Sequence, residues 1–95
     1  MRLRHIRGAE EAIETSPFVI QEPKEHRGHF CELFGNTNPI QIEVGMGKGK
    51  FIMELAQKHP ETNFIGIERY SSVLLRALQK REELEIPNIY FMCMD

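Results

Sequence analysis

The pattern of apolar and polar residues becomes regular only from Ile40 onward. Between Ile40 and Val44 apolar and polar side chains alternate, and every apolar residue is β-branched, which predicts a strand. A helix is predicted over 50–59 because apolar residues recur there on one face, at Phe51, Ile52, Leu55 and Ala56. Pro60 and the polar residues after it end that helix.

The same two periodicities then return. The apolar run from Phe64 to Ile67 predicts a buried strand that ends at Glu68. A second helix is expected to begin at Ser71 or Ser72, since serine is a good helix cap. We expect this helix to bury Val73, Leu74, Ala77 and Leu78 and to expose Arg76, Lys80 and Arg81. A third strand is predicted over 89–94.

The first 39 residues show no long periodic pattern. A turn or two of helix is expected over 9–14, and 18–20 is a short extended stretch. Elsewhere, breakers interrupt the chain too often for long elements: Pro17, Pro23, Gly28, Gly35 and Pro39. We therefore divide the chain into an irregular N-terminal extension over 1–39 and a β-α-β-α-β unit over 40–95.

Crossovers of this length join parallel strands and are right-handed in nearly all proteins. The predicted fold class is therefore α/β, the N-terminal half of a Rossmann-like parallel sheet, whose ligands bind at the carboxyl ends of the strands. With both helices on one face, we expect the other face and one edge of the first strand to be uncovered. The chain is therefore expected to be marginally stable alone, or to associate with another copy or with further sequence.

Composition and charge narrow the class of protein. Hydrophobic residues make up 41% of the chain and charged residues 27%, as in an ordinary globular domain. The net charge of −2 argues against nucleic-acid binding by bulk charge alone. There is no apolar run long enough to span a membrane and no signal-peptide core near the N-terminus. The isolated Cys31 and Cys93 favour a reducing, cytoplasmic setting.

Acids and glycines gather where the predicted strands end. Glu43 precedes the stretch Gly45-Met-Gly47-Lys-Gly49, whose GxGxG spacing differs from the GxGxxG of dinucleotide-binding enzymes. Glycines there allow a tight turn and the close approach of a ligand. Glu68 ends the second strand and Asp95 the third.

One acid at each of three consecutive strand ends describes a site for a nucleoside with a cationic tail. Glu43 suits a cationic group better than a pyrophosphate, Glu68 can accept hydrogen bonds from both ribose hydroxyls, and Asp95 can reach the adenine edge. S-adenosylmethionine has this chemistry, with an amino group, a sulfonium and no phosphate. A glycine turn or a solvated acid alone means little, so the interpretation rests on the combination.

These motifs resemble those of the tRNA (guanine-N7-)-methyltransferases. The resemblance rests on Ile42-Glu-Val-Gly-Met-Gly-Lys-Gly-Lys-Phe51 and Asn63-Phe-Ile-Gly-Ile-Glu68, with support from Met1-Arg-Leu-Arg4 and Leu33-Phe-Gly-Asn36. It implies a class I methyltransferase fold, S-adenosylmethionine as cofactor and methyl transfer to N7 of a guanosine in the tRNA variable loop. It also implies roles for the strand-end residues: Glu43 and the loop of Gly45, Gly47 and Gly49 hold the methionine part, Glu68 the ribose, and Asp95 lies beside the adenine.

In this family the fold continues well past the third strand, and the later strands hold the acid next to the target base. We therefore interpret the chain as the cofactor-binding half and expect the catalytic residues beyond Asp95. By the same resemblance Arg2, Arg4 and Arg7 would contact tRNA phosphates, although a solvated terminus explains them equally well.

Other polar residues carry weaker hypotheses. Lys48 and Lys50 stand on either side of Gly49, the last of these glycines, and could face RNA, although surface lysines more often serve solubility. His26, His29 and Cys31 lie close together, but their spacing matches no common zinc pattern, and no metal site is predicted.

Two rival functions come from other classes. An NAD-binding dehydrogenase domain is disfavoured by the glycine spacing and by the acid before the glycines. A non-catalytic, methyltransferase-like binding module is favoured by the shortness of the chain. Within the methyltransferases, another RNA or a small molecule is the alternative acceptor.

Overall fold

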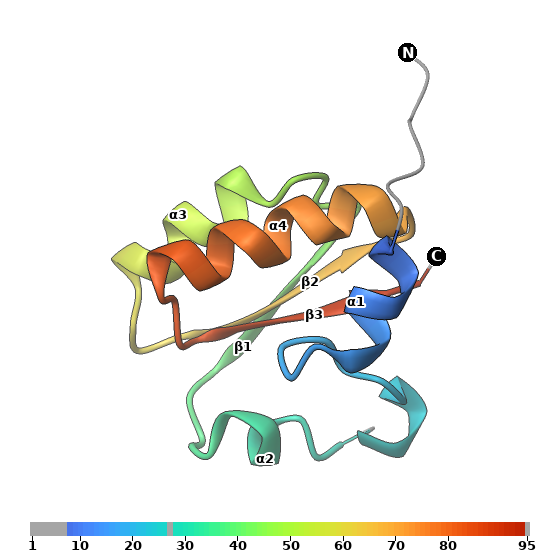
Figure 1. The fold of residues 1–95 in the computed structure, drawn as a ribbon. Coiled ribbons are helices and arrows are strands. Elements are labelled where there is room, and N and C mark those ends of the chain that lie inside the picture. Colours follow the sequence, from blue (N-terminus) through green and yellow to red (C-terminus); the bar gives the residue numbers. More distant parts are fainter. Residues whose placement is uncertain (1–7, 27, 95) are drawn as a thin grey trace.

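Three parallel strands form the sheet of this protein, whose computed structural model describes residues 8–26 and 28–94 (Figure 1). They are β1 (Ile40–Val44), β2 (Asn63–Glu68) and β3 (Ile89–Cys93), in the spatial order β1-β2-β3. The crossovers are α3 (Lys50–Lys58) and α4 (Ser71–Leu84). The predicted β-α-β-α-β order is confirmed, with element ends shifted by about one residue.

The N-terminal extension is more ordered than its sequence suggests. It contains α1 (Ala9–Thr15), a 3₁₀ turn η1 (Pro23–His26) and the single-turn helix α2 (Cys31–Phe34). Between α1 and η1 the backbone follows the outer edge of β3: Phe91 N–H donates to the Phe18 carbonyl at 2.9 Å, and Ile20 N–H donates to the Phe91 carbonyl at 2.7 Å. The extension therefore covers the edge of the sheet that is remote from β1.

The helical face of the sheet holds the larger core. Side chains of α3 and α4 pack there against Phe64 and Phe91, and Ile13 of α1 joins them. Helix α1 lies against α4, beyond the β3 edge of the sheet (Figure 1). The burial of these apolar side chains is the main stabilising contribution to the fold.

The opposite face is not bare, which corrects the expectation from sequence. Phe30, Leu33 and Phe34 pack against a second cluster that contains Ile65 and Met92. The Tyr90 hydroxyl on β3 donates a hydrogen bond to the Leu33 carbonyl at 3.1 Å. The aromatic rings of Tyr90 and Phe34 pack edge to face. The extension thus covers this face over β2 and β3.

The β1 side of that face remains open, as expected. Ile42 is 55% exposed and Val44 is 72% exposed, although both are apolar and lie within a strand. Among the described residues β1 pairs only with β2, so its other edge has backbone groups with no strand partner.

Two side chains lie where the helical pattern did not place them. Arg81, expected to face water, is only 6% exposed: its Nε donates to the Ile89 carbonyl at 3.0 Å, and its guanidinium lies 3.6 Å from the centroid of the Phe18 ring. Burial lowers the pKa of this guanidinium. Phe51, expected in the core, is exposed because the buried face of α3 is formed by Ile52, Met53 and Ala56.

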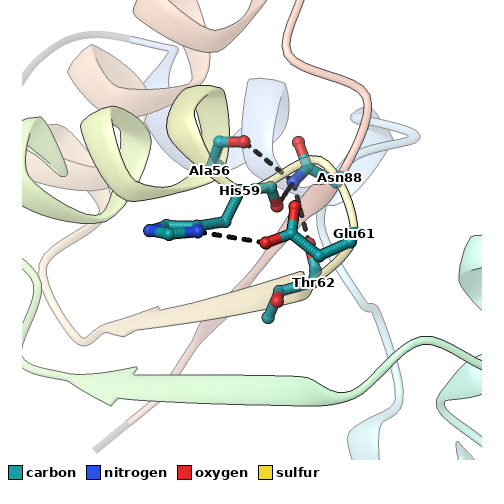
Figure 2. Close-up of polar contacts among 5 residues, drawn as sticks. All are labelled: Ala56, His59, Glu61, Thr62 and Asn88. Carbon is teal, nitrogen blue, oxygen red and sulfur yellow. Dashed lines mark hydrogen bonds and ion pairs between the residues drawn. The ribbon is translucent and has the colours of Figure 1, made fainter.

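Asn88 joins the loops at the end of the sheet remote from the glycine loop. Its Nδ2 group donates to the carbonyls of Ala56, His59 and Thr62 at 3.0, 3.1 and 2.8 Å, as Figure 2 shows. Two amide protons thus serve the C-terminal end of α3 and the turn before β2. Glu61 lies in the same turn. The pKa of its carboxyl group is lowered because the carboxylate accepts a hydrogen bond from the Glu61 backbone N–H and contacts His59.

Replacing Asn88 is predicted to destabilise the fold. Asn88→Ala leaves three carbonyls without their donor in a largely buried place, so the free energy of unfolding is expected to fall by about 1–3 kcal/mol. Urea unfolding followed by circular dichroism measures the change. The matched control is Gln79→Ala on the exposed surface of α4, and equal stability of the two variants would contradict the role of Asn88.

Candidate cofactor site

The carboxyl ends of the three parallel strands lie at the same end of the sheet (Figure 1). β1 leads into the glycine loop, which we define as Gly45–Gly49, and α3 follows it. β2 ends at Glu68, two residues before α4 begins. β3 ends at Cys93.

The glycine loop has a backbone that only glycine adopts readily. The φ angles of Gly45, Gly47 and Gly49 are 70°, 62° and 77°, all in the left-handed region. Gly49 is also confined by packing, since a Cβ there would lie 3.0 Å from the Met53 methyl carbon and 3.4 Å from the Ala77 Cβ. Gly45 and Gly47 face open space, so a ligand can lie against their backbone.

The loop is tied to β2 by backbone hydrogen bonds. Gly45 N–H and Met46 N–H both donate to the Ile67 carbonyl, at 2.8 and 3.1 Å. The Met46 side chain is buried over Gly66 of β2, in space that a Cβ at position 66 would enter. Gly66 therefore allows the loop to pack closely on the sheet.

Glu68 connects the glycine loop to the start of α4. Its side chain is 7% exposed; Oε1 accepts a hydrogen bond from Gly47 N–H at 3.1 Å, and Oε2 accepts one from Tyr70 N–H at 3.0 Å. Tyr70 occupies the N-cap position of α4 and no side chain makes a capping hydrogen bond there, which corrects the expected cap at Ser71 or Ser72. Each carboxylate oxygen accepts one of these bonds and has capacity for another, so Glu68 can still bind the two hydroxyls of a ribose.

Glu43 lies on the same face of the sheet as Glu68. It pairs in register with Gly66, two residues before Glu68 on the neighbouring strand. Its carboxylate is partly buried and has no hydrogen bond or ion pair with any residue in the described ranges. A partly buried and unpaired carboxylate is suited to a cationic group of a ligand.

The end of β3 adds a thiol beside Glu68. Cys93 is the register partner of Glu68, and Met94 N–H donates to the Glu68 carbonyl at 3.2 Å. Burial raises the pKa of the Cys93 thiol, and the nearby carboxylates of Glu68 and Glu10 add to the shift. At neutral pH Cys93 is therefore a protonated thiol, unlike a reactive thiolate.

An aromatic ring also lies next to Glu68. Tyr70 is 41% exposed, and the Arg69 guanidinium lies 4.5 Å from the centroid of its ring. The Tyr70 hydroxyl accepts a hydrogen bond from Arg69. This pair forms an exposed flat surface beside the carboxylate.

The structure thus brings together most of the residues that the sequence singled out. The glycine loop and Glu68 are in direct contact, and Glu43 lies on the adjoining strand. Four others, Arg2, Arg4, Arg7 and Asp95, lie outside the described residues. Within residues 8–26 and 28–94 no three His, Cys, Asp or Glu side chains cluster as metal ligands, and no helix is long and apolar enough to cross a bilayer.

Sequence reasoning missed three contributors to this edge of the sheet. Gly66 had a usable signal, since a lone glycine within an apolar strand often marks the close approach of another segment. The Tyr70 backbone N–H had none, because a backbone donor leaves no trace in the residue type. Cys93 had none either, because it comes beside Glu68 only when β2 and β3 pair in register.

Comparisons with known proteins identify the family and the fold. A family model described as "Putative methyltransferase" matches residues 37–95. The tRNA (guanine-N(7)-)-methyltransferase of Lachnoclostridium phytofermentans is 55% identical over 95 residues, covering all of this chain and 44% of the relative. The Bacillus cytotoxicus protein of the same name is 51% identical over 96 residues, again with 44% of its length covered. The chain thus spans less than half the length of these relatives.

Solved structures support the fold. The antibiotic-resistance methyltransferase Kmr matches 73% of this chain and 37% of its own, with a TM-score of 0.57 and 23% identity. Phosphoethanolamine N-methyltransferase 2 of Haemonchus contortus, in complex with S-adenosyl-L-methionine, matches 90% of this chain and 20% of its own, with a TM-score of 0.54 and 18% identity. The three-stranded sheet is therefore part of a Rossmann-like methyltransferase fold. The match over residues 37–95 shows that the chain belongs to the family described as "Putative methyltransferase", and along its whole length the chain is similar to part of the tRNA (guanine-N(7)-)-methyltransferases named above.

Proposed function

We propose that this chain binds S-adenosylmethionine as the cofactor half of an enzyme that methylates N7 of a guanosine in the tRNA variable loop. The observation that carries the cofactor assignment is the Glu68 carboxylate, held between the glycine loop and the start of α4 with hydrogen-bonding capacity to spare. The names of the full-length relatives support the acceptor. We propose the cytoplasm as the place of this reaction.

Each candidate residue has a defined part in this proposal. Glu68 binds the ribose hydroxyls, while Glu43 and the open backbone of the glycine loop receive the methionine part. Asp95 is assigned to the adenine edge from the sequence alone. The fit is chemical: the site offers carboxylates for hydroxyl and ammonium groups, whereas Glu43 would repel a pyrophosphate.

The chemistry requires little from the protein beyond alignment. S-adenosylmethionine supplies a methyl group on a positively charged sulfur, and guanine N7 has a free lone pair, so no proton has to leave before attack. Holding the reactants in line is then the main source of acceleration. We assign no catalytic residue within this chain and propose that the groups contacting guanine lie beyond Asp95.

The alternative is a methyltransferase-like module that binds without transferring a methyl group. It makes a different prediction, because a module of this kind would leave guanine N7 of tRNA unmodified.

Cofactor binding is tested by calorimetric titration with S-adenosylhomocysteine. We expect saturable binding and no heat with NADH. Glu68→Ala is expected to lower the affinity at least tenfold, because hydrogen bonds to a charged group contribute about 1.5–3 kcal/mol. Glu83→Gln, an exposed change on α4, is the matched control. Binding of NADH, or full affinity in Glu68→Ala, would refute the assignment.

The acceptor is tested in the cell. Expression of the gene in a bacterium that lacks 7-methylguanosine in its tRNA is expected to restore that nucleoside in tRNA digests. Digests without 7-methylguanosine, despite cofactor binding by the purified chain, would favour the non-catalytic module.

The open side of β1 is the proposed route of self-association. Ile42 and Val44 expose apolar surface next to backbone groups that lack a strand partner. Sedimentation velocity of this chain is expected to show association that increases with concentration. Val44→Lys should weaken it because a lysine on an edge strand opposes pairing, and a chain that stays monomeric at every concentration would contradict the proposal.

A further inference from the structure

A groove of about 500 Å³ runs between α3 and α4 and begins beside the glycine loop. Four cationic residues line it. Lys48 belongs to the loop, Lys50 is the first residue of α3, and Arg76 and Lys80 are on α4. Glu54 is the one acid among the residues that line the groove.

The cations have no internal partner. In the described part of the chain none of the four forms an ion pair, although the chain as a whole has a net charge of −2. Lys48 and Lys50 also lie at the N-terminal end of α3, where the helix dipole disfavours positive charge. Unpaired cations gathered at an unfavourable place are better explained by an external anion than by the stability of the fold.

Cationic and acidic side chains lie on different sides of α4. Arg76 and Lys80 are four residues apart, about 6 Å along the helix axis, and face the groove with α3. Another face of α4 packs against α1, whose Glu10 and Glu14 line a separate cavity of about 570 Å³ at the end of β3. A polyanion is therefore attracted to the α3–α4 side and repelled from the α1 side.

Apolar residues also line the groove. They are Met53 of α3 and Leu84, the last residue of α4, and Leu84 is 38% exposed. Apolar surface beside cations fits a chain that alternates charged phosphates with the carbon surface of sugars. An arginine among these cations can also bind phosphate oxygens in bidentate fashion.

We infer that the α3–α4 groove binds the phosphodiester backbone of the RNA substrate beside the glycine loop. This inference rests on the proposed function, because it assigns a surface to the RNA that the enzyme methylates. Contacts of this kind set the position of the RNA without reading its sequence. They would orient the RNA so that the target guanosine enters the site at the carboxyl ends of the β-strands.

The test measures binding of a fluorescently labelled tRNA to this chain by anisotropy over a series of KCl concentrations. The double variant Arg76→Gln/Lys80→Gln removes two cations from the groove. Each phosphate contact contributes about 0.7–0.9 to the slope of log affinity against log salt, so the slope is expected to become less steep by about 1.5. The matched control, Lys24→Gln/Lys58→Gln, removes two exposed cations elsewhere and should keep the original slope.

Two further readouts separate this inference from the proposed function. Both double variants should bind S-adenosylhomocysteine like the original chain, because neither alters Glu43, Glu68 or the glycine loop. Equal slopes in the two double variants would overturn the groove assignment and leave cofactor binding intact. Poly-L-glutamate that competes as strongly as tRNA would also overturn it, since the groove would then accept an acidic peptide equally well.

Discussion

The Glu68 carboxylate fixes the conformation of the chain at the carboxyl ends of β1 and β2. One of its oxygens accepts the Gly47 N–H and the other accepts the Tyr70 N–H, so a single side chain joins the loop after β1 to the start of the helix after β2. Both donors are backbone groups at places where the chain leaves regular structure, and each needs a partner because the site is partly buried. The residue proposed to bind the ribose thus also preorganises its surroundings.

β2 is the strand on which the rest of the site depends. It pairs with both other strands, accepts the loop's two N–H groups at the Ile67 carbonyl and accommodates the Met46 side chain over Gly66. A loop held in this way presents the backbone of Gly45 and Gly47 to a ligand without further ordering, which reduces the entropic cost of binding. The N-terminal extension supports the opposite side of the sheet through its contacts with β3.

Local periodicity was sufficient to predict the elements of the sheet and the residues at their ends. The alternation in β1, the apolar run of β2 and the glycine spacing are short-range signals, and parallel pairing then brings the strand ends to one edge. Long-range contacts were not readable in the same way. Arg81 is buried because Phe18, far away in the sequence, covers its guanidinium, and nothing near Arg81 in the sequence indicates that contact. The aromatic cover over β2 and β3 was missed for the same reason.

The role of Glu68 as the connection between loop and helix is tested most directly by hydrogen exchange of individual amides, followed by NMR, in the original chain and in Glu68→Ala. The account predicts that exchange at Gly47 and Tyr70 becomes much faster in the variant. Exchange at Phe64, whose N–H donates to the Asn88 carbonyl at 2.8 Å, should stay the same. Unchanged protection at Gly47 and Tyr70 would contradict the account, because the loop would then be held without the carboxylate.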